Sequence, residues 1–161
     1  MNFIKKNATW ILTIIVVAIL IQSLFFKFMD SSETKYIFEG KLEPWAMSLG
    51  FRGLFAPGGI FSAKVVGTFE LLTSILLIIG AFLNNKMQIQ TLGGLLGIKI
   101  ISGAIFFHLF TPLGIAVVNT DGSSDGGVLF ILSLMVFVCC ALIVFLRRGE
   151  WLPLIQKIFK K

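Results

Sequence analysis

Four apolar runs, each 19 or 20 residues long, set the limits on how this chain can fold. An α-helix needs about 20 predominantly apolar residues to cross the hydrocarbon core of a bilayer, which is roughly 30 Å thick. Each run has this length. We therefore predict an all-α, integral membrane four-helix bundle that forms a single membrane domain over residues 1–161. The predicted spans are about 8–28, 62–83, 91–110 and 127–147.

The composition leaves no room for a soluble domain beside the spans. Apolar residues make up 57% of the chain and charged residues 14%, whereas soluble domains have about 45–50% and about 25%. The net charge of +6 comes from basic residues that flank the apolar runs. No basic cluster is interleaved with stacking aromatic residues, as nucleic-acid binding would require. We expect the lipid bilayer as a partner and no nucleic acid.

The positions of the basic residues predict the orientation of the chain. Two lysines precede the first span, one lies in the turn between the second and third spans, and five basic residues follow the last span. In the loop over 111–127, by contrast, the charged residues are acids. Because positive charge is retained in the cytoplasm, we expect both termini there and the connections over 30–61 and 111–127 outside.

The 30–61 connection carries signals for short helices at the membrane surface. Ser31–Thr34 has a hydroxyl cap followed by an acid, which is typical of a helix start. Glu43–Gly50 places a proline near a helix start and a glycine just past the helix end. The aromatic residues of this connection suit the membrane interface. We predict one or two interfacial helices within about 31–61.

Glu70 is a single carboxylate in an otherwise uncharged run over 65–83. An ionised group at membrane depth costs about 2.5–3.5 kcal/mol on insertion scales, so it needs a partner or a proton. At helical spacing, Glu70 shares a stripe of small or polar residues with Gly67 and Ser74. We expect this stripe to face the interior of the bundle.

Two lysines are candidate partners of Glu70. The helical rise places Lys99 within about 6 Å of Glu70 in height, and Lys27 can reach the carboxylate from the outer rim. The resulting cluster is interpreted either as a structural ion pair that fixes helix register or as a pocket for a small anionic or quinone-like molecule. The predicted ligand-binding residues are Gln22, Lys27, Lys64, Glu70, Lys99 and His108.

No self-contained catalytic or metal-binding pattern is present in the sequence. His108 is nine residues from Lys99, so we expect it to face the outer loops unless the helix is distorted. The adjacent Cys139 and Cys140 are interpreted as small apolar packing residues. The Asp- and Gly-rich segment 119–127 lacks the ligand spacing of a calcium loop and is interpreted as a turn. Whether the chain is an enzyme stays open.

Three segments of the sequence resemble the DoxX family of small four-helix bacterial membrane proteins. They are Gln22–Phe28 at the end of the first span, Val66–Leu72 in the second, and Asp125–Phe130 together with the stop at Arg147-Arg148 in the fourth. The resemblance implies a bacterial inner-membrane location. It also implies that Lys27 and Glu70 occupy positions that are characteristic of the family.

The charged residues within the spans and the resemblance together leave three functions open. Relatives include a subunit of a thiosulfate:quinone oxidoreductase and members of complexes that handle oxidative or sulfur stress. We expect a membrane subunit or binding module for a lipophilic or quinone-like ligand. The alternatives are the membrane subunit of a quinone-linked oxidoreductase, whose partner redox subunit carries the cofactor, and a small proton-coupled transporter. This chain differs from a plain family member in its long aromatic connection, which a lid or a partner-docking surface would explain.

Overall fold

A computed structural model describes residues 3–83, 88–118, 121–149 and 151–152. Within these ranges the chain is all-helical, apart from an isolated bridge between Val118 and Ser124. Four of the described helices, α1, α4, α5 and α6, are long and apolar enough to cross a membrane. The helices are α1 (Phe3–Phe28), α2 (Ser32–Lys35), η1 (Tyr36–Leu42), α3 (Glu43–Ser48), α4 (Ala63–Phe82), α5 (Gln88–Phe110) and α6 (Val128–Leu146).

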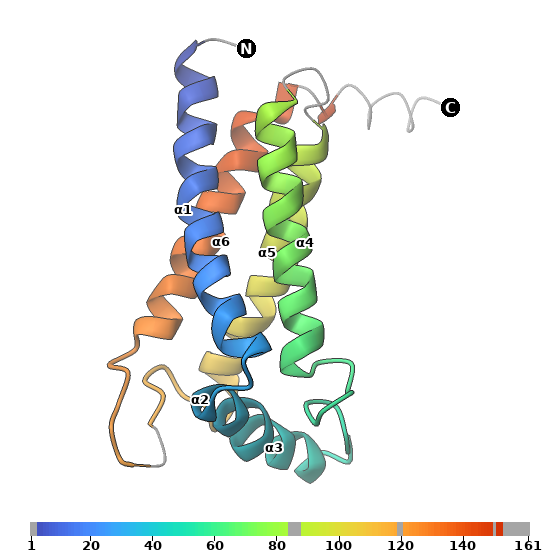
Figure 1. Ribbon diagram of the computed structural model, residues 1–161, viewed down its shortest axis with the longest axis vertical. Coiled ribbons are helices and arrows are strands. Elements are labelled where there is room, and N and C mark those ends of the chain that lie inside the picture. Colours follow the sequence, from blue (N-terminus) through green and yellow to red (C-terminus); the bar gives the residue numbers. More distant parts are fainter. Residues whose placement is uncertain (1–2, 84–87, 119–120, 150, 153–161) are drawn as a thin grey trace.

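The long helices pack side by side, α1 on α4, α4 on α5, α5 on α6, and α6 back on α1 (Figure 1). The start of α1 and the end of α6 lie at one end of this bundle, and α2 and α3 lie across the other, which we call the capped end (Figure 1). The core between the long helices is formed by Val16, Leu20, Leu77, Ile101, Val136, Cys139, Cys140 and Ile143. The predicted packing role of both cysteines is therefore confirmed.

The predicted spans match the long helices closely at the capped end. At the other end α1 begins at Phe3 instead of residue 8, and α5 begins at Gln88 instead of residue 91. Hydropathy marks the apolar part of a helix, but the helical backbone continues through polar residues such as lysine and glutamine that have good helix propensity. The predicted turn around Lys86 and the basic tail beyond Leu152 lie outside the described residues.

The predicted short helices of the first connection are present as one continuous run of α2, η1 and α3. Ser31 caps this run by accepting a hydrogen bond from the Thr34 N–H at 3.2 Å. The expected α-helix at Glu43 is present as α3, with Pro44 in its first turn. It continues the helical run that precedes it, because the Glu43 N–H donates to the carbonyl of Phe38, five residues back. The segment η1 is thus π-helical. Pro44, which has no N–H to donate, stands where the run returns to α-helix.

The capped end has its own apolar cluster. The Phe55 ring packs edge-on against Phe107 of α5, with centroids 5.1 Å apart. The loop that carries Phe55 is held by Glu43, which accepts hydrogen bonds from the N–H groups of Gly53 (2.5 Å) and Phe55 (2.8 Å). These N–H groups hold the pKa of Glu43 below its usual value. The cluster is Leu42, Ala46, Phe55, Leu113 and Val117.

Glycines let α5 approach its neighbours closely. A Cβ added at Gly97 would lie 2.7 Å from Cys140 Sγ of α6. A Cβ at Gly80 of α4 would overlap the backbone of Gln90. Gly103 is an exception among the α5 glycines, because the nearest atom to an added Cβ there is 4.0 Å away on Phe107. Gly103 therefore faces open space inside the bundle.

Candidate functional site

The buried carboxylate of α4 is paired with a lysine of α1. Lys27 Nζ lies 2.6 Å from Glu70 Oε1, and the two side chains are 13% and 5% exposed. The same ammonium donates to Ser23 Oγ at 2.8 Å. Of the two predicted partners of Glu70, Lys27 is the one that contacts it. The predicted contact with Lys99 is not formed: within the described residues Lys99 has no ion pair or hydrogen bond.

The local packing of α1 on α4 explains this choice. An added Cβ at Gly67, one turn before Glu70, would lie 3.6 Å from the Cβ of Lys27 and 3.4 Å from the Phe28 ring. The base of Lys27 therefore packs directly against α4 at Gly67, with room for no more than a methyl group between them. Gly67, Glu70 and Ser74 are all buried, which confirms the predicted stripe. Within the described part of the chain, Glu70 Oε2 is buried without a hydrogen-bond partner.

A cavity of about 730 Å³ lies beside the Lys27–Glu70 pair. Its walls come from all the long helices and from the capped end, and most of its lining is apolar. A volume of this size with a few polar groups in an apolar wall is typical of small-molecule sites. The polar residues that line it are Gln22, Ser23, Lys27, Glu33, Thr34, Glu70, Lys99, His108, Asp125 and Ser133.

His108 faces the loop that follows α5 and also lines the cavity. Its side chain is buried, its Nδ1 lies 2.7 Å from the carbonyl oxygen of Gly114, and its ring packs edge-on against Phe130. Because a carbonyl oxygen can only accept a hydrogen bond, Nδ1 carries the proton. His108 thus contacts the loop after α5, as expected, and α5 is continuous around it.

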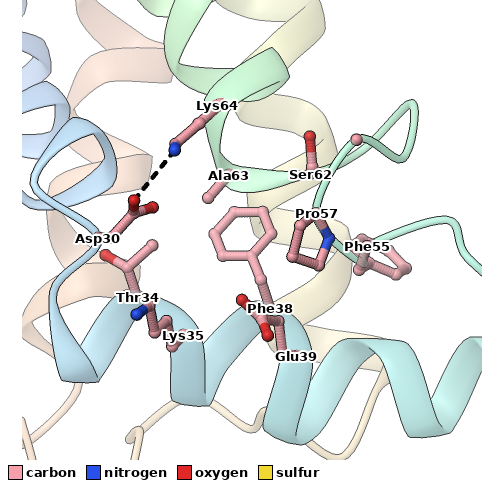
Figure 2. A pocket seen from close by; sticks show the side chains of 11 residues that line it. Asp30, Thr34, Lys35, Phe38, Glu39, Phe55, Pro57, Ser62, Ala63 and Lys64 are labelled. Atoms are coloured by element: carbon pink, nitrogen blue, oxygen red, sulfur yellow. Dashed lines mark ion pairs between the residues drawn. The ribbon is translucent and has the colours of Figure 1, made fainter.

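Lys64 does not join the large cavity. It pairs with Asp30 at 3.0 Å, and both side chains are well exposed, at 60% and 49%. This pair lines a smaller cavity of about 440 Å³ between η1 and the start of α4. Figure 2 shows Lys64 reaching toward Asp30, and Phe38 pointing from η1 toward the start of α4. Because Thr34 and Phe38 line both cavities, the smaller one adjoins the larger.

Sequence reasoning missed five polar residues of the cavity wall, which are Ser23, Glu33, Thr34, Asp125 and Ser133. Ser23 lies one helical turn before Lys27, and this spacing could have identified it as a contact of the ammonium. Asp125 was interpreted as part of a turn, but it accepts hydrogen bonds from the N–H groups of Val117 (2.7 Å) and Gly127 (2.9 Å). An acid just before an apolar run is a helix-start signal that could have identified Asp125.

No family model, no curated protein and no solved structure matches this chain. The fold and the site define a class of protein. It is a helical bundle in which four helices of the described residues are long and apolar enough to cross a membrane. The bundle contains a largely apolar cavity with charged groups in its wall. These groups can accept and donate hydrogen bonds and balance charge.

Proposed function

We propose that this chain is a multi-pass protein of the bacterial inner membrane that binds a lipophilic, quinone-like ligand in the large cavity. In this proposal α1, α4, α5 and α6 span the bilayer, both termini are cytoplasmic and the capped end is outside. The apolar lengths of these helices support the spans, and the basic residues near the termini support the orientation.

The observation that carries the proposal is the incomplete pairing of Glu70 in the cavity wall. If a buried ion pair served packing alone, each of its polar atoms should have a hydrogen-bond partner, because a buried acceptor without one destabilises the fold. Glu70 Oε1 has Lys27, whereas Oε2 has no hydrogen-bond partner in the described residues. A hydroxyl on a quinol-like ligand would satisfy it once the Glu70 side chain turns Oε2 toward the cavity. The apolar remainder of the wall would hold the ring and tail.

The resemblance to the DoxX family supports the same pair of residues. Lys27 and Glu70 carry that resemblance, and they are in contact across α1 and α4. We therefore propose a DoxX-like binding module. Its redox chemistry, where there is any, would be supplied by the quinone and a partner subunit.

Thermal unfolding in detergent tests the proposal with decylubiquinone as the probe. Because a ligand that binds the folded state raises its stability, we expect the probe to raise the Tm of the wild type by several degrees. Gly103→Leu places a bulky side chain in the ligand space at a position that is open in the wild type, so its Tm should respond less or not at all. Failure of decylubiquinone, a fatty acid and a lipid extract to shift the wild-type Tm would remove the ligand-binding function.

A further inference from the structure

Lys99 is a cation at the centre of an apolar helix. It stands at the midpoint of α5, roughly 16 Å from either end at the helical rise. A lysine side chain that snorkels toward a membrane surface covers only part of that distance. A charge at this depth is costly unless it is compensated. Within the described residues, however, Lys99 has no ion pair or hydrogen bond, and its exposed side chain lines the cavity.

The acids of the cavity wall are already engaged elsewhere. In the described part of the chain these acids are Glu33, Glu70 and Asp125. Glu70 is neutralised by Lys27. Asp125 accepts hydrogen bonds from three backbone N–H groups around the start of α6. Glu33 lies in the first turn of α2, at the capped end. Among the described residues of the cavity wall, Lys99 is therefore a cation without a counter-ion.

The space next to Lys99 is free and becomes apolar toward the capped end. Gly103 lies one turn closer to that end on the same face of α5, and an added Cβ there would have no neighbour within 4 Å except Phe107, at 4.0 Å. Beyond Gly103 the wall is formed largely by aromatic and aliphatic side chains. They are Ile37, Phe38, Leu42, Ile60, Phe61, Phe107, Leu113 and Val117.

We infer that the cavity takes a monoanionic amphiphile whose carboxylate or sulfonate pairs with Lys99 and whose apolar body extends toward the capped end. This inference rests on the proposed function, because it concerns the same cavity and specifies a lipophilic ligand that carries an anionic head. Charge complementarity selects the anion, and the apolar wall selects the body. A two-chain phospholipid does not fit this role, because its headgroup stays at the membrane surface, roughly 16 Å from Lys99.

Two matched probes test the inference in nanodiscs of phosphatidylcholine. Pyrenebutyrate and pyrenebutanol share one apolar body and differ in the anionic head. Their binding is measured by energy transfer from Trp45, with Trp45→Phe as the optical control. Because a charge-assisted hydrogen bond is roughly twice as strong as a neutral one, we expect the acid to bind the wild type about tenfold more tightly than the alcohol.

The variants separate the anion site from the cavity itself. Lys99→Gln should lose the preference for the acid, Lys99→Arg should keep it, and Gly103→Leu should bind neither probe. Equal binding of acid and alcohol to the wild type would overturn the anion site and leave the cavity function standing. Binding of neither probe to the wild type would overturn both. Displacement of the acid when phosphatidylglycerol replaces phosphatidylcholine would contradict the inference by assigning Lys99 to a lipid headgroup.

Discussion

At the scale of single residues, the Lys27–Glu70 pair determines how α1 meets α4. Removing one partner of a buried pair leaves an uncompensated charge and costs about 3–5 kcal/mol. Lys27→Met and Glu70→Gln should therefore each lower the free energy of unfolding markedly. The double variant should lose less than the sum of the two. Unfolding in mixed micelles measures this, and Lys64→Gln, in an exposed pair, should cost at most about 1 kcal/mol. Single variants as mild as Lys64→Gln would show that the buried pair does not hold the helices together.

Glu43 holds a single loop of the capped end in place through hydrogen bonds. The N–H groups of Gly53 and Phe55 lower its pKa, so its carboxylate stabilises the fold above the usual glutamate pKa of about 4.3. That contribution is lost as the pH falls through the lower, folded-state pKa. Glu43→Gln should increase trypsin cleavage after Arg52 at neutral pH. Glu39→Gln, on an exposed side chain of the neighbouring turn, is the control. Equal cleavage in both variants would show that Glu43 does not hold the loop.

At the scale of helices, two glycines on α4 and α5 should respond oppositely to the same substitution. Gly80→Ala places a methyl group against the backbone of Gln90, which cannot move aside like a side chain. We expect a loss of about 1–3 kcal/mol from this overpacking. Gly103→Ala adds a methyl group in open space, and alanine favours a helix by about 1 kcal/mol over glycine. It should be neutral or stabilising in the same unfolding assay. A reversed order would mean that the α4–α5 contact is looser than described.

The sequence predicts the helices better than it predicts their contacts. Apolar length identifies the spans, and the isolated charge identifies Glu70, because both signals are local. The choice of Lys27 over Lys99 depends on which helices are neighbours and on how closely α1 packs against Gly67. The depth of a residue in the membrane reveals neither. The π-helical segment and the loop contacts of Glu43 were missed for the same reason, since both depend on groups that come together only in the fold.

At the scale of the whole molecule, the capped end and the start of α1 should lie on opposite sides of the membrane. Ser48→Cys is exposed at the capped end, Lys5→Cys is exposed near the start of α1, and the native Cys139 and Cys140 are buried. A membrane-impermeant maleimide should label Ser48→Cys in intact cells. It should label Lys5→Cys only after lysis. The reverse pattern would invert the orientation that the basic residues predict.

The central claim is that the bundle is built around an occupied cavity, and photochemical labelling tests it most directly. A short-chain quinone with a diazirine group is irradiated with the wild type in membranes, and its adducts are mapped by mass spectrometry. We predict adducts on cavity-lining residues such as Phe107 and Ile100, and their loss in Gly103→Leu. Adducts that fall instead on outward-facing residues such as Leu95 and Phe106, unchanged in Gly103→Leu, would contradict the account.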